Sequence, residues 1–346
     1  MKKYYIDNMK SFVIILVVIF HVIASFSSNN SVLNYHAEGI PWFDAIGYLL
    51  YPWFMILMFI ISGMTAHYSL RKRTSNQFMV DRIKFVLIPF IIFQLTFGAI
   101  TSWFSFEVNN MVDKLSELPD SVINVIRVMN GMGPSWYLLQ LFITSFIFWL
   151  VLKFINLEKY RDKLSSLNIL VIILLVIPIF ISAQYGYILY TFRFFLYTLA
   201  FFLGYLIFSN EEILSLLSKH SIMLSICSIV LGIIQMTMYW GKSYMVIVNE
   251  PMVVLFSWFS VLAVLGLFYK YVNSTNQTAI FLSQYSYGIY LFHFLPLTIG
   301  AYLIDIFHVH LYLRYFILLL FTFIFSILFT FMIKNIPLVS KLFGFK

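Results

Sequence analysis

The segment "NMKSFVIILVVIFHV", residues 8–22, is an apolar run that has a lysine near its start, Lys10, and a histidine inside it, His21. An ionisable side chain at membrane depth costs free energy and indicates a functional site. On a helix, this spacing is about 20° beyond three full turns, so Lys10 and His21 share a face and lie about 16 Å apart along the axis. Asp7 lies one turn before Lys10, at a spacing that allows an ion pair. The alternative interpretation is a snorkelling Lys10 and a His21 bonded to a neighbouring carbonyl.

The composition excludes a water-soluble domain. Of the 346 residues, 62% are hydrophobic and only 10% are charged, whereas a soluble domain has roughly 25% charged residues. The net charge of +8 comes from basic residues in short gaps between apolar runs, which is typical of membrane topology and not of a nucleic-acid surface. The single cysteine, Cys227, excludes an internal disulfide. The chain is therefore predicted to be a multi-pass membrane protein.

About ten apolar runs are long enough to cross a bilayer, which takes about 20 residues each. The predicted fold is an all-α integral membrane protein whose residues 1–346 form a single domain. An even number of spans places both termini on one side. With the N-terminus in the cytoplasm, 17 of the 22 lysines and arginines also lie there and 5 lie outside, so both termini are predicted to be cytoplasmic. The predicted spans centre near Val18, Leu57, Phe93, Phe146, Leu175, Ala200, Ile229, Leu262, Tyr290 and Phe323.

The longest predicted outer connection runs over residues 105–133 and contains four carboxylates, one of them Glu107. A loop of this length is often functional, so we expect a short lid helix or a re-entrant segment there, with a plain connector as the alternative. No internal repeat is visible, which counts weakly against a transporter built from inverted repeats.

A second group of polar residues lies in the ninth run, "SQYSYGIYLFHFLP". Ser286, Tyr290 and His293 fall on one helical face, and Pro296 is expected to free a backbone carbonyl. Tyr290 and His293 would serve equally well as hydrogen-bonding residues between helices.

Three shorter segments complete the set of candidate residues. Trp136 in "GMGPSWYLLQLF" starts the fourth run, where an interfacial tryptophan is also expected. Arg82 and Lys84 in "DRIKFVLIP" lie at the predicted cytoplasmic end of the third run, where basic residues are ordinary topology signals. The pair His308 and His310 lacks further ligands at metal-binding spacing, so no metal site is expected.

Taken together, these segments resemble the acyltransferase-3 family of integral membrane acyltransferases over most of the chain. The opening "YYIDNMKSFVIILVVIFHV" resembles the family's first span, in which ten residues separate a basic residue from a histidine; here these are Lys10 and His21. The later strings "FMILMFIISGMTA", "PSWYLLQLF", "FFLGYLIF" and "SYGIYLFH" follow in the family's order. Two positions depart from the family pattern: Lys10 replaces an arginine, and Phe85 occupies the second of two arginine positions before Pro89.

The resemblance implies an O-acyltransferase that moves an acyl group, commonly acetyl, from cytoplasmic acyl-CoA to a hydroxyl of a cell-surface glycan or glycolipid. The expected location is the plasma membrane of a bacterium. Acetyl-CoA would act as a substrate, with no bound cofactor. Some members carry an extracellular hydrolase-like domain. None is expected after the last run here, so any second transfer step would need a separate extracellular partner enzyme or would not occur.

Within this scheme, His21 is predicted to be the catalytic base, because an imidazole has a pKa close to neutrality. Lys10, held by Asp7, would hold the donor, and Arg82 and Lys84 would attract its CoA phosphates. Three residues are expected to border the acceptor cavity, namely Trp136, Tyr290 and His293. A carboxylate is expected to orient the imidazole, with Asp44, Glu107 and Glu250 as the candidates.

Two other functions fit ionisable residues within membrane spans. One is a secondary transporter of a glycan or another anionic substrate, with Lys10, His21 and His293 along its path. The other is a non-catalytic membrane subunit of a polysaccharide assembly. Release of CoA by the purified protein would distinguish the enzyme from both.

Overall fold

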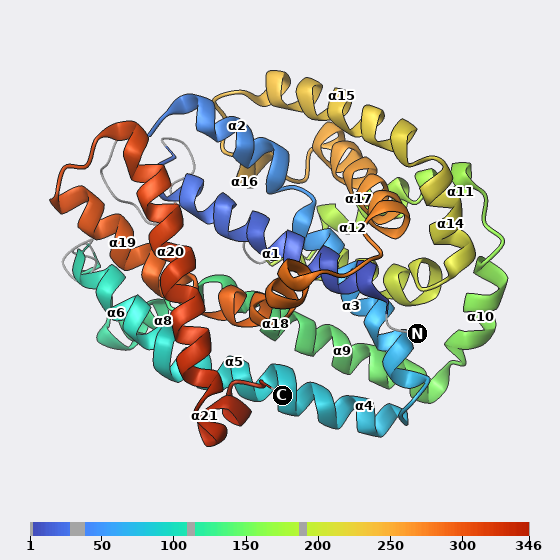
Figure 1. Cartoon of the computed structure of the whole chain (residues 1–346), viewed down its shortest axis with the longest axis horizontal. Helices are drawn as coiled ribbons and strands as arrows, with labels where there is room; N and C mark the ends of the chain where they lie inside the picture. The colour runs from blue at the N-terminus through green and yellow to red at the C-terminus, as the bar shows by residue number, and fades with distance from the viewer. Residues whose placement is uncertain (1–2, 28–38, 109–114, 187–191, 346) are drawn as a thin grey trace. The chain divides into compact units, whose positions relative to one another are not determined.

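The computed structural model describes residues 3–27, 39–108, 115–186 and 192–345, and within these ranges it is entirely helical (Figure 1). Seven of its helices are long and apolar enough to cross a membrane, and two bent helix pairs raise the number to nine. The remaining predicted run is a shorter apolar helical segment, Ile169–Gln184. The predicted fold class is therefore confirmed, with seven to nine candidate spans among the described residues.

The chain divides into two compact units, and five helices contribute residues to both. The first unit comprises Met1–Val13, Ala45–Val80 and Ile143–Ser283, and the second comprises Ile14–Asp44, Asp81–Phe142 and Gln284–Lys346. The five shared helices are α1 (Tyr4–Ser25), α2 (Pro41–Leu50), α4 (Ser75–Arg82), α9 (Trp136–Phe154) and α18 (Gln277–Phe292).

In the first unit, α3 (Phe54–Leu70) packs against α13 (Phe194–Leu203) and the π-helical turn η4 (Gly204–Phe208). Glycines allow this close approach: a Cβ on Gly63 would collide with the carbonyl oxygen of Phe201, and one on Gly204 with that of Ile60. Small residues at such crossings are the usual means of packing helices in a membrane. The close contact places the end of α3 beside η4, where α10 (Leu157–Leu164) also packs.

The rest of the first unit surrounds α17 (Pro251–Tyr271). This helix packs against α12 (Val176–Gln184), α14 (Glu211–Lys219) and α15 (Ser221–Tyr239). Trp258 of α17 is fully buried and donates from its indole nitrogen to the carbonyl of Ile172, at 3.0 Å. Two short helices, α11 (Ile169–Leu174) and α16 (Tyr244–Ile247), complete this unit.

In the second unit, α19 (Phe294–Ile306) packs against α20 (Leu311–Lys334) and α6 (Ala99–Val108). The predicted helix in the long connection is present as α8 (Asp120–Asn130), which packs on α6; residues 109–114 of this connection lie outside the described residues. The other elements of the unit are η1 (Ile83–Leu87), α5 (Ile88–Phe93), η2 (Gln94–Gly98), η3 (Gly133–Ser135) and α21 (Pro337–Leu342).

The ninth predicted span is broken at His293, where α18 ends and α19 begins with a bend of 63°. The cause is Pro296, because a proline lacks an N–H donor and its ring clashes with the carbonyl four residues earlier, here Phe292. The carbonyl that Pro296 leaves without its helical N–H partner is that of Phe292, the last residue of α18.

Candidate functional site

His21 lies on α1 within the second unit and remains partly exposed. Its Nδ1 is 2.8 Å from the carbonyl oxygen of Val17, one turn earlier on the helix. A carbonyl can only accept, so the Nδ1 of His21 must carry the proton and donate. In the neutral ring, Nε2 is then the atom that can accept a proton.

His293 belongs to the same unit and is completely buried. Its Nδ1 lies 2.7 Å from the carbonyl oxygen of Tyr290 and 3.2 Å from that of Ile289, so Nδ1 donates and Nε2 is left as an acceptor in the neutral ring. The Ile289 carbonyl also accepts the backbone N–H of His293, at 3.0 Å, so the imidazole lies against the last turn of α18, where the chain bends into α19.

The two imidazoles contact each other. Nε2 of His293 lies 3.4 Å from Nδ1 of His21, and the ring centroids are 5.1 Å apart. The donor Nδ1–H of His21 thus faces both the Val17 carbonyl and the acceptor nitrogen of His293. Both neighbours favour the same tautomer of His21, in which Nε2 is unprotonated. We call His21 and His293 the histidine pair.

The start of α9 is connected to the histidine pair. The hydroxyl of Tyr290 donates to the carbonyl of Pro134, and its ring meets that of Tyr137 edge-on at 5.7 Å. Phe294 contacts the His21 ring edge-on at 5.7 Å. It also fills the space beside Gly133, whose φ of +41° suits glycine and where a Cβ would lie 2.8 Å from the Phe294 ring.

Trp136 is the first residue of α9 and is partly exposed, so the predicted acceptor-side residues Trp136, Tyr290 and His293 all belong to the second unit, with His21. The hydroxyl of Tyr290, however, already has a backbone partner, and the side chain is 5% exposed. Its observed contacts position the segment that precedes α9.

Among the described residues, a second histidine lies beside His21, where a carboxylate was expected. Among the described side chains, no carboxylate contacts the His21 ring. Asp44 is buried on α2, and Glu250 belongs to the first unit, where the hydroxyl of Tyr239 donates to it at 3.5 Å. The side chain of Glu107 lies outside the described residues.

The residues predicted to bind the donor are not among the contacts described for the histidine pair. Asp7 and Lys10 are partly exposed on α1 in the first unit, and α1 is continuous from them to His21. In the second unit, Arg82 ends α4 and is partly exposed, while Lys84 is exposed in the π-helical turn η1. Side chains two positions apart on a helix project from nearly opposite sides, so Arg82 and Lys84 reach different parts of any shared ligand.

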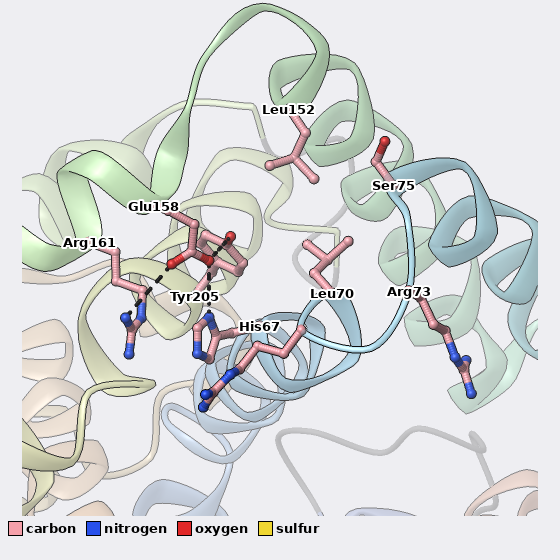
Figure 2. Close-up of a pocket in the computed structure, with 9 residues that line it drawn as sticks. His67, Leu70, Arg73, Ser75, Leu152, Glu158, Arg161 and Tyr205 are labelled. Carbon is pink, nitrogen blue, oxygen red and sulfur yellow. Dashed lines mark hydrogen bonds and ion pairs between the residues drawn. The ribbon is translucent and has the colours of Figure 1, made fainter.

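A second polar site was missed by the sequence analysis. In the first unit, His67, Glu158, Arg161 and Tyr205 point toward one another at the edge of a cavity (Figure 2). The sequence did contain a signal: His67 lies at the end of an apolar run, and three residues separate it from the basic segment "RKR". In the sequence, the three basic residues of this segment look like ordinary topology signals at the end of a span.

Comparison with protein-family models gives a match to the acyltransferase-3 family, described as "Acyltransferase domain", over residues 3–331. The chain belongs to the acyltransferase-3 family. It is therefore a multi-pass membrane acyltransferase, and this assignment decides between the enzyme and the transporter. Neither curated proteins nor solved structures gave a significant match. Among the described residues of this acyltransferase, no group of three or more His, Cys, Asp or Glu side chains could hold a metal ion.

Proposed function

We propose that this acyltransferase-3 protein transfers an acetyl group from cytoplasmic acetyl-CoA to a hydroxyl of an extracytoplasmic carbohydrate, such as a cell-surface glycan or glycolipid. Family membership supports the acyl transfer. The observation that carries the proposal is the histidine pair, in which one partly exposed imidazole is held by Nδ1 with its Nε2 available. An alcohol is a weak nucleophile and needs such a base.

In the proposed reaction, Nε2 of His21 removes the proton of the acceptor hydroxyl as the oxygen attacks the thioester carbonyl. The C–O bond forms, the C–S bond breaks, and the proton passes from the imidazolium to the departing CoA sulfur. The products are an ester and free CoA thiol, and His21 is neutral again. His293 acts as a positioning residue, because its Nε2 accepts from the Nδ1–H of His21 and favours the reactive tautomer.

The substrate contacts are proposed on chemical grounds. Lys10, with Asp7 one turn before it, would contact the donor, while Arg82 and Lys84 would attract its phosphates. Trp136 would stack on a sugar ring of the acceptor, since an aromatic face suits an apolar sugar face. Tyr290 and His293 would then shape the acceptor side from behind, because both are buried.

The test is an assay with purified protein, acetyl-CoA and extracted surface glycans, in which free CoA thiol and acetylated glycan are both measured. The proposal expects the two products in equal amounts and only when both substrates are present. Thiol release without acetylated glycan would contradict the carbohydrate acceptor. Glycan movement into vesicles without thiol release would contradict the transfer itself.

We further propose that the single membrane domain has both termini in the cytoplasm of a bacterial cell, at its plasma membrane. The asymmetry of lysine and arginine supports this orientation. In a Cys227→Ser background, a membrane-impermeant maleimide added to intact cells should label Ser116→Cys and not Ser75→Cys. The opposite labelling pattern would reverse the orientation.

A further inference from the structure

The first unit contains a cavity of about 580 Å³ that the proposed reaction does not use. It lies where α3 ends and α4 begins, next to α10 and η4, and its lining includes His67, Arg71, Arg73, Glu158 and Arg161 (Figure 2). Its size falls in the usual range of small-molecule sites, about 300–1,000 Å³. We call it the arginine cavity.

Its charged side chains are predominantly cationic. The lining contains three arginines, namely Arg71, Arg73 and Arg161, and one carboxylate, that of Glu158. Arg71 is exposed, and its guanidinium has no ion-pair or side-chain hydrogen-bond partner among the described residues. Arg71 and Arg161 line this cavity together with the buried His67, and the same three residues line the neighbouring depression.

Arg161 is held in place by its neighbours. Its Nε donates to Oγ of Ser209 at 3.1 Å. Its Nη1 donates to Oδ1 of Asp162 at 3.3 Å and lies 3.8 Å from Oε2 of Glu158. Within the described part of the chain, its Nη2 has no hydrogen-bond partner. One edge of this guanidinium is therefore available to a ligand while the other is anchored.

Glu158 is itself fixed from two further directions. Its Oε1 accepts from the hydroxyl of Tyr205 at 2.8 Å and lies 3.4 Å from Nδ1 of His67, which is 3% exposed. Figure 2 shows these three side chains and Arg161 as one connected group. Because Tyr205 and His67 are set by the packing of α3 on η4, they hold the carboxylate that positions Arg161.

The opposite side of the cavity also favours an anion. Ser75 lines it at the first residue of α4. Thr74 and Gln77 cap this helix reciprocally: the Thr74 N–H donates to Gln77 Oε1 and the Gln77 N–H to Thr74 Oγ1, at 3.0 and 3.3 Å. The positive end of the helix dipole adds to the arginines.

The neighbouring depression, about 350 Å³, shares His67, Arg71 and Arg161 but contains Asp162, Glu211 and Glu212. An anion is repelled there and attracted into the arginine cavity. Guanidinium forks match the geometry of phosphate oxygens better than that of neutral sugar hydroxyls. These observations favour a phosphate group as the ligand.

We propose that the arginine cavity binds a phosphate ester, with Arg71 and Arg161 contacting the phosphate oxygens and Glu158 positioning Arg161. Two molecules at a membrane surface carry this chemistry, the nucleotide end of acyl-CoA and the headgroup of an anionic lipid. The first source rests on the proposed acetyl-CoA donor; the second does not.

The experiment measures binding of two probes to the full-length protein in detergent: CoA by calorimetry and phosphatidylglycerol by native mass spectrometry. The test variant is Arg71→Gln with Arg161→Gln. Its matched control is Lys72→Gln with Lys159→Gln, which removes the same charge from exposed positions one and two residues away that do not line the cavity. Hydrogen bonds to charged groups are among the stronger ones, so each lost guanidinium should weaken binding by about tenfold or more.

A loss of affinity for CoA in the test pair, with the control pair within about twofold of wild type, supports the site and identifies the nucleotide as the ligand. The same pattern with phosphatidylglycerol identifies the lipid. Equal losses in both pairs, or no loss for either probe, would overturn the proposal. Arg71→Lys with Arg161→Lys keeps the charge and should lose part of the affinity, which provides a second measurement if the glutamine pair does not fold.

The result can be separated from the proposed function through His21→Gln. That variant should bind CoA as wild type does, because His21 is not part of the cavity. If His21→Gln still transfers acetyl groups, the proposed catalytic base is wrong, while the phosphate site is judged only by the arginine variants.

Discussion

The histidine pair and the arginine cavity each contain a histidine whose Nδ1 faces an oxygen atom, but the partners differ. His21 faces a backbone carbonyl and another imidazole, both of them uncharged acceptors. His67 faces the carboxylate of Glu158 and the charges of two arginines. A ring among neutral partners can take up and return a proton during a reaction, whereas a ring in a charged network serves to hold that network in place. Similar residues therefore lead us to propose catalysis in one unit and binding in the other.

The largest expected effect tests the catalytic half of this comparison. His21→Gln keeps hydrogen bonding but cannot take the proton, so acetyl transfer should fall by about 10²–10⁴-fold, the usual contribution of general acid–base catalysis. Initial rates at saturating acetyl-CoA measure it, with expression and membrane insertion checked by immunoblot. If the variant keeps at least half of the wild-type rate, His21 is structural and another group is the base.

His293 should show a smaller effect because it acts through His21. His293→Leu removes the acceptor for the Nδ1–H of His21, and kcat should fall roughly ten- to a hundredfold, as for other residues that orient a reactive imidazole. His293→Gln can restore an acceptor and should recover part of the rate. Equal rates for the leucine and glutamine variants would show that His293 serves packing alone.

Arg82 and Lys84 offer a second basic set that competes with the arginine cavity for the donor phosphates. Neutralising both with glutamine should raise the donor KM by roughly tenfold and leave kcat at saturating donor unchanged, because phosphate contacts bind without taking part in the chemistry. Steady-state kinetics with varied acetyl-CoA measure this, and Lys72→Gln with Lys159→Gln is the control. An unchanged KM would return Arg82 and Lys84 to topology signals.

His67→Gln gives the smallest expected effect and the sharpest contrast with His21. The substitution removes one contact of the half-exposed Glu158 carboxylate while both guanidinium groups remain, so phosphate-ester affinity should fall only a few-fold. The transfer rate at saturating donor should stay within about twofold of wild type. A loss of kcat comparable to that of His21→Gln would remove the distinction between the two histidines.

Much of the fold was predictable because a bilayer imposes a simple rule on the sequence. A spanning helix needs a long apolar run, so nine of the ten predicted spans coincide with candidate spans or bent helix pairs. The tenth corresponds to a segment of 16 residues, Ile169–Gln184, which is apolar but shorter. The break at His293 also followed from local chemistry, since Pro296 cannot continue the helix.

The residues of the candidate sites also differ in whether the sequence alone could identify them. The sequence by itself determined that His21, Tyr290 and His293 are unusual, because polar residues inside apolar runs are visible without a structure. Only the tertiary structure decided that a histidine, and no described carboxylate, faces His21, since this contact joins residues 272 positions apart. The arginine cavity was likewise decided by packing. Its residues come from separate helix ends, where basic side chains look like ordinary topology signals until the glycine-mediated approach of α3 to η4 gathers them around one space.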